Sequence, residues 1–253
     1  MLNKSEIINA VNSIPNFAFK DVYVKGVDGN MHKTSFKVIV EENTNNVISI
    51  VTNKYKLIQF KDVYMPIIDS FQDCFGDLKY CDGVGIMLIF PDGESFVFDS
   101  ANHKYRVGLY IINSVNKTSS VKINFAILYD NKYFFVIPRI KGFKRKHIGN
   151  IEKVVADYEK FLDNIKETWK TIVTKLSEKY LDDNELEELL NELKLGKKIR
   201  KIIKNSGYKN VWDIFNLSIS EILKKKYKKE TSRYEKIRYI CDIIYKYAVI
   251  EEL

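Results

Sequence analysis

The longest regular pattern in the chain is an apolar repeat in its C-terminal half. From residue 151 to residue 176, apolar or aromatic side chains recur at alternating steps of four and three residues without a break. They are Ile151, Val155, Tyr158, Leu162, Ile165, Trp169, Ile172 and Leu176. A mean spacing of 3.5 residues places one apolar stripe along a single long helix. We therefore expect a helix over about residues 150–180, with a stripe that another element must cover.

A stripe of this length is typical of a helix that packs against another subunit or another domain. We expect it to form the main subunit or interdomain contact and predict a homo-oligomer. The residues expected in this contact are Val155, Leu162, Ile165, Trp169 and Ile172.

The N-terminal half follows a period of two instead, which indicates strands. A short helix capped by Asn3 precedes a hairpin that turns at residues 28–30, and a third strand covers residues 47–52. A helix is predicted over residues 60–75 with Gly76 as its stop. The further predicted strands are residues 78–82, 85–90, 95–99, 105–113, 120–129 and 133–138. Antiparallel strands in meander order with one intercalated helix predict an α+β fold.

Two units are expected along the chain. Residues 1–148 form an α+β platform, and residues 149–253 form a helical unit with the long helix and a small basic bundle over 183–250. Within the bundle, Gly196 and Gly207 are predicted helix stops. Capping boxes at Ser218 with Glu221, and at Ser232 with Glu235, are predicted to open the last two helices.

Charge is distributed unevenly between these halves. Residues 1–137 contain 14 basic and 14 acidic residues, whereas residues 138–253 contain 27 basic and 19 acidic residues, which gives the net charge of +8. Lysine dominates, with 35 Lys against 6 Arg. Lysine neutralises phosphates as a point charge and lacks the planar fork that reads bases, so this surface favours sequence-tolerant binding of nucleic acid.

Motifs for other functions are missing from the sequence. No apolar run reaches the roughly 18 residues of a membrane span, and the N-terminus lacks the pattern of a signal peptide. Three cysteines without a CxxC pair argue against a disulfide framework, so we expect a cytoplasmic protein. The histidines have no metal-ligand spacing, and no nucleotide-binding or hydrolase motif is present. We expect no cofactor, no metal and no enzymatic activity.

One enzymatic alternative stays open. Acidic residues gather in sequence between residues 73 and 94, and a metal-dependent nuclease could use their carboxylates. These residues are Asp73, Asp77, Asp82, Asp92 and Glu94. Loops of globular proteins are commonly acidic, which is the simpler interpretation.

The segment 139–147 is the main candidate for nucleic-acid binding. Its cationic residues are Arg139, Lys141, Lys144, Arg145, Lys146 and His147, with no acidic residue among them and with Phe143 between them. Such a segment can clamp a single strand, because the cations follow the backbone while the ring stacks on a base. Lys104, Arg106 and Lys117 are further candidate contacts. The alternative for 139–147 is a solvated linker. The basic runs at 194–204 and 224–229 are interpreted as solvent-facing helix surfaces.

Three stretches resemble a phage- and plasmid-associated family, domain of unknown function number 932. They are Thr52–Gln59, the Ile112-Asn113-Ser114 segment with the residues just after it, and Lys146-His147-Ile148-Gly149-Asn150-Ile151 at the entry to the long helix. In this chain Val115-Asn116-Lys117 stands where the family has Asp-Gly. The order of strands and helix is also similar to that of ring-forming single-strand annealing proteins.

The resemblance implies replication or recombination of mobile elements. Together with the charge pattern, it leads us to expect a sequence-tolerant protein that binds single-stranded DNA and could also anneal strands. A structural or host-interaction protein of a mobile element is the alternative, with lysines that only keep it in solution.

Overall fold

The computed structural model describes the chain except residues 101–102, 117–120, 131–132, 138–150 and 250–253. The fold is mixed α and β, with an antiparallel, strand-rich N-terminal part and helices mostly in the C-terminal part. The strands are β1 (Leu2–Asn3), β2 (Phe17–Lys25), β3 (Met31–Glu41), β4 (Val47–Thr52), β5 (Cys74–Cys81), β6 (Val84–Pro91), β7 (Val97–Ser100), β8 (His103–Ser114), β9 (Lys122–Tyr129) and β10 (Tyr133–Ile137). The helices are α1 (Lys4–Ser13), α2 (Phe60–Asp69), α3 (Ile151–Glu178), α4 (Asp183–Glu192), α5 (Lys197–Ser206), α6 (Val211–Lys224) and α7 (Glu230–Val249), with a 3₁₀ turn at Glu94–Phe96.

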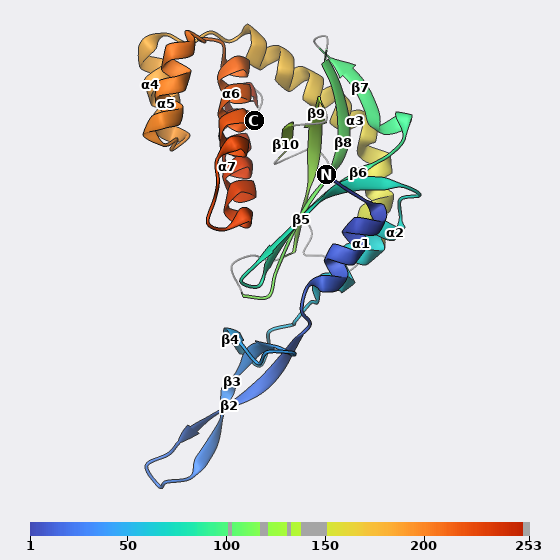
Figure 1. Cartoon of the computed structure of the whole chain (residues 1–253), viewed down its shortest axis with the longest axis vertical. Coiled ribbons are helices and arrows are strands. Elements are labelled where there is room, and N and C mark those ends of the chain that lie inside the picture. The colour runs from blue at the N-terminus through green and yellow to red at the C-terminus, as the bar shows by residue number, and fades with distance from the viewer. Residues whose placement is uncertain (101–102, 117–120, 131–132, 138–150, 250–253) are drawn as a thin grey trace.

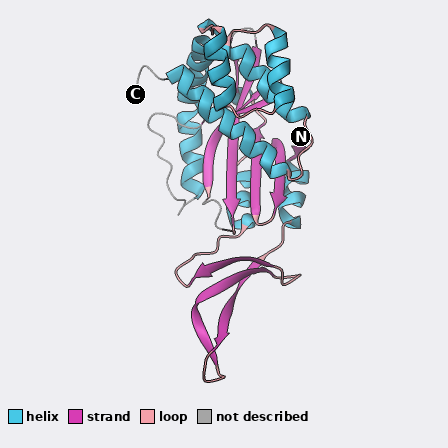
Figure 2. Ribbon diagram, turned by 90° about the vertical axis from the view of Figure 1, so that its left-hand side faces the viewer, coloured by secondary structure: helices cyan, strands magenta, loops and turns pink. Residues whose placement is uncertain are grey.

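The main sheet has the strand order β1-β5-β6-β8-β9-β10, and β7 also pairs with β8. All eight residues of β6 are buried, as are all but the first of β9, so both faces of the sheet are covered. Helices provide this cover (Figures 1 and 2). Helix α1 contacts β5, and α2 contacts β6. Helix α3 contacts β7 and β8, and α7 contacts β5, β6 and β10.

The helical half and the strand-rich half share one apolar core. Trp169 on α3 lies at the centre of this junction. Its ring centroid is 5.1 Å from that of Phe135 on β10, 6.0 Å from that of Tyr105 on β8 and 5.9 Å from that of Trp212 on α6. Three helices of the C-terminal half, α3, α6 and α7, therefore pack directly on the sheet.

The apolar stripe of α3 is covered by its own chain. Leu162, Ile165, Trp169 and Ile172 are 9%, 0%, 3% and 4% exposed. Of the subunit or interdomain contact expected for this stripe, these four residues form a contact between the helical and strand-rich parts of their own chain, and their burial there leaves little of them exposed to another subunit. The side chain of Val155, the fifth residue expected in that contact, lies outside the described residues.

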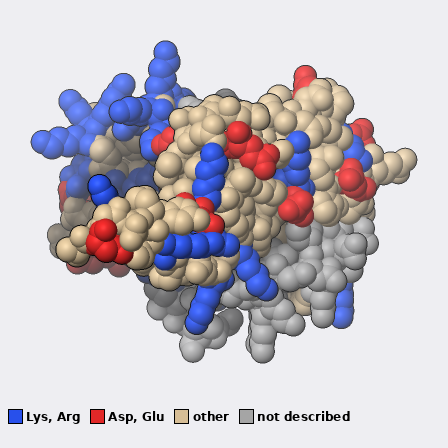
Figure 3. All heavy atoms as spheres, turned by 90° about the horizontal axis from the view of Figure 1, so that it is seen from below, with Lys and Arg blue, Asp and Glu red and all other residues tan. Residues whose placement is uncertain are grey.

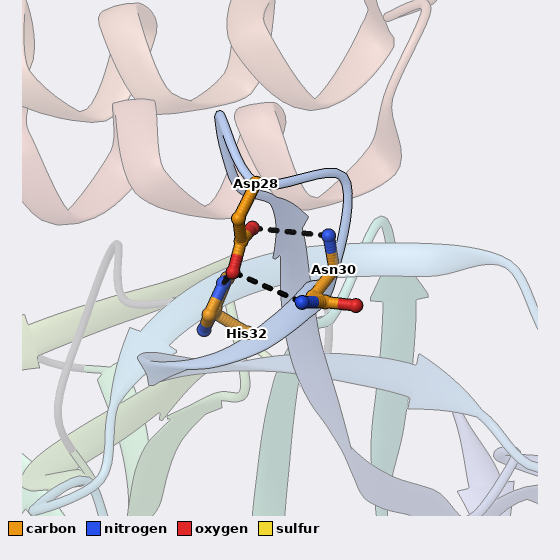
Figure 4. Close-up of polar contacts among 3 residues, drawn as sticks. All are labelled: Asp28, Asn30 and His32. Carbon is orange, nitrogen blue, oxygen red and sulfur yellow. Dashed lines mark hydrogen bonds and ion pairs between the residues drawn. The ribbon is translucent and has the colours of Figure 1, made fainter.

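A second sheet extends away from the body as an arm of three strands, β2, β3 and β4 (Figure 1). The predicted hairpin turn lies at its tip, where Gly29 has a φ of 82°. There the Asp28 carboxylate accepts hydrogen bonds from the backbone N–H and the side-chain amide of Asn30 at 3.0 and 3.1 Å, and lies 3.0 Å from His32 Nε2 (Figure 4). The hydrogen bond with His32, followed by those with Asn30, lowers the pKa of Asp28.

Local signals were correct at some helix ends and wrong at others. The Asn3–Glu6 capping box is present, and Gly207 ends α5 in the left-handed conformation. The helix predicted over residues 60–75 ends at Asp69, and Gly76 lies within β5. A Cβ at Gly76 would overlap the Leu88 carbonyl oxygen of β6, so close strand packing accounts for this glycine.

The helical half also departs from its predicted caps. Gly196 caps the N-terminus of α5 instead of ending a helix, and Ser232 lies inside α7. Ser218 is fully buried within α6, where its hydroxyl donates to the Ile214 carbonyl at 2.7 Å. Asn210 is the true cap of α6, because its side-chain oxygen accepts from the backbone N–H of Trp212 at 2.9 Å.

Candidate nucleic-acid interface

The predicted clamp over residues 139–147 lies outside the described residues, as does Lys117. The nucleic-acid candidates that fall on it are Arg139, Lys141, Phe143, Lys144, Arg145, Lys146 and His147. Two other candidates, Lys104 and Arg106, lie on β8. Lys104 is exposed and available to a ligand.

Arg106 has a structural role. Its guanidinium donates to the Pro91 carbonyl at 2.7 Å, pairs with Asp92 at 3.3 Å and lies 5.3 Å from the centre of the Phe75 ring. The side chain is only 17% exposed. This arginine holds the turn after β6 in place, so its charge is already engaged within the chain.

The acidic residues that the sequence groups together lie at different places along the β5–β6 pair. Asp73 and Asp92 are neighbours, because the Asp92 backbone N–H donates to the Asp73 carbonyl at 3.0 Å, whereas Asp77 lies within β5 and Asp82 follows its end. Asp82 pairs with Lys229 of the α6–α7 connection, and this contact lowers the pKa of Asp82. Asp77 accepts from the Tyr234 hydroxyl and lies 3.0 Å from Lys79 Nζ. Within the described part of the chain, no three His, Cys, Asp or Glu side chains are placed to hold a metal ion. Four of the five carboxylates proposed for a nuclease, those of Asp73, Asp77, Asp82 and Asp92, accept from or pair with nearby donors.

A group of cations gathers where three separate segments meet. We call it the Lys236 cluster, and it consists of Lys194, Lys225, Arg233 and Lys236 with the rings of Tyr227 and Tyr239. Lys194 belongs to the turn between α4 and α5, Lys225 and Tyr227 to the α6–α7 connection, and the others to the first three turns of α7.

The cluster is held in place by backbone and ring contacts. Lys236 Nζ donates to the carbonyls of Leu193 and Lys194 at 2.8 and 3.1 Å, which satisfies acceptors at the C-terminal end of α4. Lys194 adopts a left-handed φ of 48° at this turn. Arg233 donates to the Lys225 carbonyl at 2.9 Å and so fixes the α6–α7 connection beside α7.

Each tyrosine ring of the cluster lies under two cations. Lys236 Nζ and Lys194 Nζ are 4.8 and 5.6 Å from the centre of the Tyr239 ring. Lys225 and Arg233 are 5.4 and 5.8 Å from the centre of the Tyr227 ring. Cation–π attraction offsets part of the repulsion among these like charges, which permits four cations to occupy one region.

The remaining repulsion is visible at Lys236. Its pKa is lowered from the usual lysine value, first by partial burial and then by the positive charges of Lys194 and Lys225. A lysine whose charge is disfavoured by its neighbours is stabilised by a bound anion. The cluster therefore favours a negatively charged ligand.

Exposed lysines extend the cluster along the α6–α7 connection. Lys225, Lys226 and Lys228 are exposed, and none forms an ion pair with a described residue. By contrast, the flanking Lys224 and Lys229 pair with Glu221 and Asp82. Lys and Arg side chains crowd together on the left of Figure 3, the side on which Figure 1 shows α4–α7. This basic surface is continuous with the Lys236 cluster through Lys225.

The basic run at 224–229 is evident in the sequence, where it is typical of an ordinary solvent-facing helix surface. The run alone does not predict that Lys194 and Lys236 lie beside it in the folded chain, because about 30 residues separate Lys194 from Lys225 in sequence. The aromatic residues near these lysines, Tyr227 within the run and Tyr239 beyond it, were the signal that could have marked this surface.

Proton uptake should report an anion bound at this cluster. A phosphate beside Lys236 raises its lowered pKa, so binding of a single-stranded oligonucleotide should take up protons at the high pH at which Lys236 of the free protein loses its proton. At lower pH, where Lys236 is protonated in both the free and the bound protein, its contribution should vanish. Calorimetry in two buffers of different ionisation enthalpy measures this uptake. The Lys236→Gln variant should show less uptake than the parent at high pH, and equal uptake by the two proteins would contradict an anion site here.

Comparison with protein-family models, with curated proteins and with solved structures finds no match for this chain. None of the helices in the described part of the chain is long and apolar enough to cross a membrane.

Proposed function

We propose that this protein binds single-stranded nucleic acid through its phosphates, with little preference for base sequence. The observation that carries the proposal is the Lys236 cluster, in which cations from three segments lie together and the pKa of Lys236 is lowered, first by partial burial and then by the charges of Lys194 and Lys225. Nucleic acid supplies closely spaced phosphates that neutralise such a surface and release counterions. Because three of the four cations are lysines, their contacts position the backbone without reading bases.

A second contact in this proposal is the segment 139–147. Its cations would track the backbone and Phe143 would stack on a base, while the Lys236 cluster and the exposed lysines beside it bind further phosphates. On the resemblance to the phage and plasmid family, we place this activity in recombination or replication of mobile elements, with single-stranded DNA as ligand and strand annealing as the reaction to assay.

Fluorescence anisotropy tests the proposal directly. The parent protein is titrated into a labelled single-stranded DNA, the matching duplex and the matching RNA at two or more salt concentrations. The logarithm of the binding constant should fall by about 0.7 per neutralised phosphate for each tenfold rise in salt. Binding should be similar for unrelated single-stranded sequences. No binding to any of the three nucleic acids at low salt would overturn the proposal.

The variant K225A/K226A/K228A locates the surface. Three lost phosphate contacts should reduce the salt slope by about 2 and weaken binding by about 10²-fold at 0.05 M salt. The matched control is K197A/K198A/K201A on α5, which removes the same charge from exposed lysines outside the Lys236 cluster. Equal losses in the two variants would indicate a general effect of net charge instead of a binding surface at the α6–α7 connection.

A further inference from the structure

The arm formed by β2, β3 and β4 carries most of the exposed apolar surface. Of the eleven large hydrophobic residues that are exposed in the described chain, seven lie between residues 17 and 52. They are Tyr23, Val24, Val27, Met31, Phe36, Val47 and Ile50. Only the base of the arm is buried, at Phe17, Ile39, Val40 and Val51. An apolar surface concentrated on one projecting element is typical of a protein–protein contact.

Two other edge strands of the described chain, β10 and β2, are protected. The edge strand β10 is covered by α7, and the Val136 backbone N–H donates to Cys241 Sγ of that helix at 3.3 Å. The edge strand β2 carries the charged residues Lys20, Asp21 and Lys25, and its pairing with β3 is interrupted between Asp21 and Tyr23. Charges and irregular pairing are the usual devices that prevent an edge strand from pairing further.

The edge strand β4 lacks such charges. Its sequence, Val-Ile-Ser-Ile-Val-Thr, contains no charged residue and no proline, and it pairs only with β3 in the described chain. Its one irregularity lies near its start, at Ile48, and regular pairing with β3 continues from Ser49 to Thr52. Ile50 pairs with Val38 of β3, and Phe36 lies two residues from Val38 on the same face of that strand. These three residues form one apolar patch, in which Ile50 is 54% exposed and Phe36 is 47% exposed.

Charges of opposite sign flank β4. Glu41 and Glu42 precede it, and Lys54 and Lys56 follow it. Glu42, Lys54 and Lys56 are exposed and form no ion pair with any residue in the described ranges. When two copies of such a strand pair antiparallel, the acidic end of each lies beside the basic end of the other. Parallel pairing would bring like charges together, so the flanks favour the antiparallel arrangement of two identical strands.

We propose that two copies of this chain associate by antiparallel pairing of β4 with β4 across a two-fold axis. The two arms then form one six-stranded sheet, and the patches of Phe36, Val38 and Ile50 from both copies lie side by side on the same face. Because each copy uses the same edge, pairing consumes both free edges and closes the assembly at a dimer. This contact is independent of α3, whose apolar stripe is buried within the chain.

Sedimentation velocity over a range of concentrations tests the dimer. The full chain should show twice the mass of one copy, with a monomer appearing on dilution. The variant V47K/I50K places two lysines on each β4, so the paired strands carry four like charges close together, and it should weaken the dimer by at least ~10-fold. The matched control is Y23K/V24K on β2, whose parent residues are 50% and 53% exposed on the same arm. It should leave the dimer intact.

Three results of these sedimentation experiments would contradict the proposal. They are a parent chain that is monomeric at every concentration, a mass that rises without limit as concentration increases, and a control that dissociates as readily as V47K/I50K.

A second pair of variants tests the dimer if the lysines on β4 disturb the folding of the arm. K54E/K56E should weaken the dimer through repulsion between acidic flanks, and E42K added to it should restore association in part. Failure of that rescue would exclude antiparallel self-pairing, and association with an added strand-forming peptide instead of a second copy would also contradict it.

Discussion

Replacing Ile165 with Asp should unfold most of the chain under conditions in which the parent is stable. Ile165 is fully buried on α3, in the core that joins this helix to the sheet. The change removes apolar packing and buries a carboxylate without a partner, which together cost about 4 kcal/mol or more. Since domains of this kind are typically stable by about 5–15 kcal/mol, a large part of the free energy of unfolding should be lost. Urea denaturation followed by circular dichroism measures the change.

The exposed residue Thr174 on the same helix provides the control. Thr174→Asp adds the same charge without entering the core, and its free energy of unfolding should stay within about 0.5 kcal/mol of the parent value. The two interpretations of the α3 stripe predict different results for Ile165→Asp. A well-folded chain with a smaller assembled mass would show that the stripe is a subunit contact, whereas loss of the fold confirms the intramolecular packing.

Removing both proposed nucleic-acid contacts should give the largest loss of affinity. A chain with K144A/R145A/K146A and K225A/K226A/K228A loses six cations. At about 0.7 per phosphate contact, the slope of the logarithm of the binding constant against the logarithm of the salt concentration should become shallower by about 4. At 0.05 M salt this corresponds to a loss on the order of 10⁴–10⁵-fold for single-stranded DNA. Anisotropy titrations at several salt concentrations measure both quantities. The loss should be the same for all base sequences, because phosphate contacts carry no base information.

The two triple variants, taken separately, identify which surface carries binding. If each flattens the salt slope by about 2, the strand contacts both segments. If K144A/R145A/K146A binds as tightly as the parent, the segment 139–147 is a linker, and the binding surface belongs to the helices around Lys236. Phe143→Ala should weaken binding by about 1–3 kcal/mol with little change in slope, which is the result expected for a lost stacking contact.

Some features of this protein follow from the sequence alone, because they depend on residues that are close together in the chain. The 3.5-residue repeat predicts α3 to within two residues of its observed ends, Ile151 and Glu178. The turn at residues 28–30 and the Asn3–Glu6 capping box formed as predicted, since hydrogen bonds within a few residues determine both. Strand β4 has the predicted bounds, Val47–Thr52.

Other features depended on partners that are distant in sequence. The apolar pattern of residues 60–75 suits a helix, but eight residue pairs with β6 draw Cys74–Cys81 into the sheet. The stripe on α3 predicts that something covers it, but only the tertiary structure shows that Tyr105, Phe135 and Trp212 do so.

The Lys236 cluster was also decided by the tertiary structure. Charge counts place the excess of cations in the C-terminal half, but three segments must fold together before Lys194, Lys225 and Lys236 act on one another. Local patterns determined α3, the turn at residues 28–30 and the Asn3–Glu6 capping box because their interactions span a few residues. Strand pairing, burial and charge crowding depend on contacts between distant segments, which form only when the whole chain is folded.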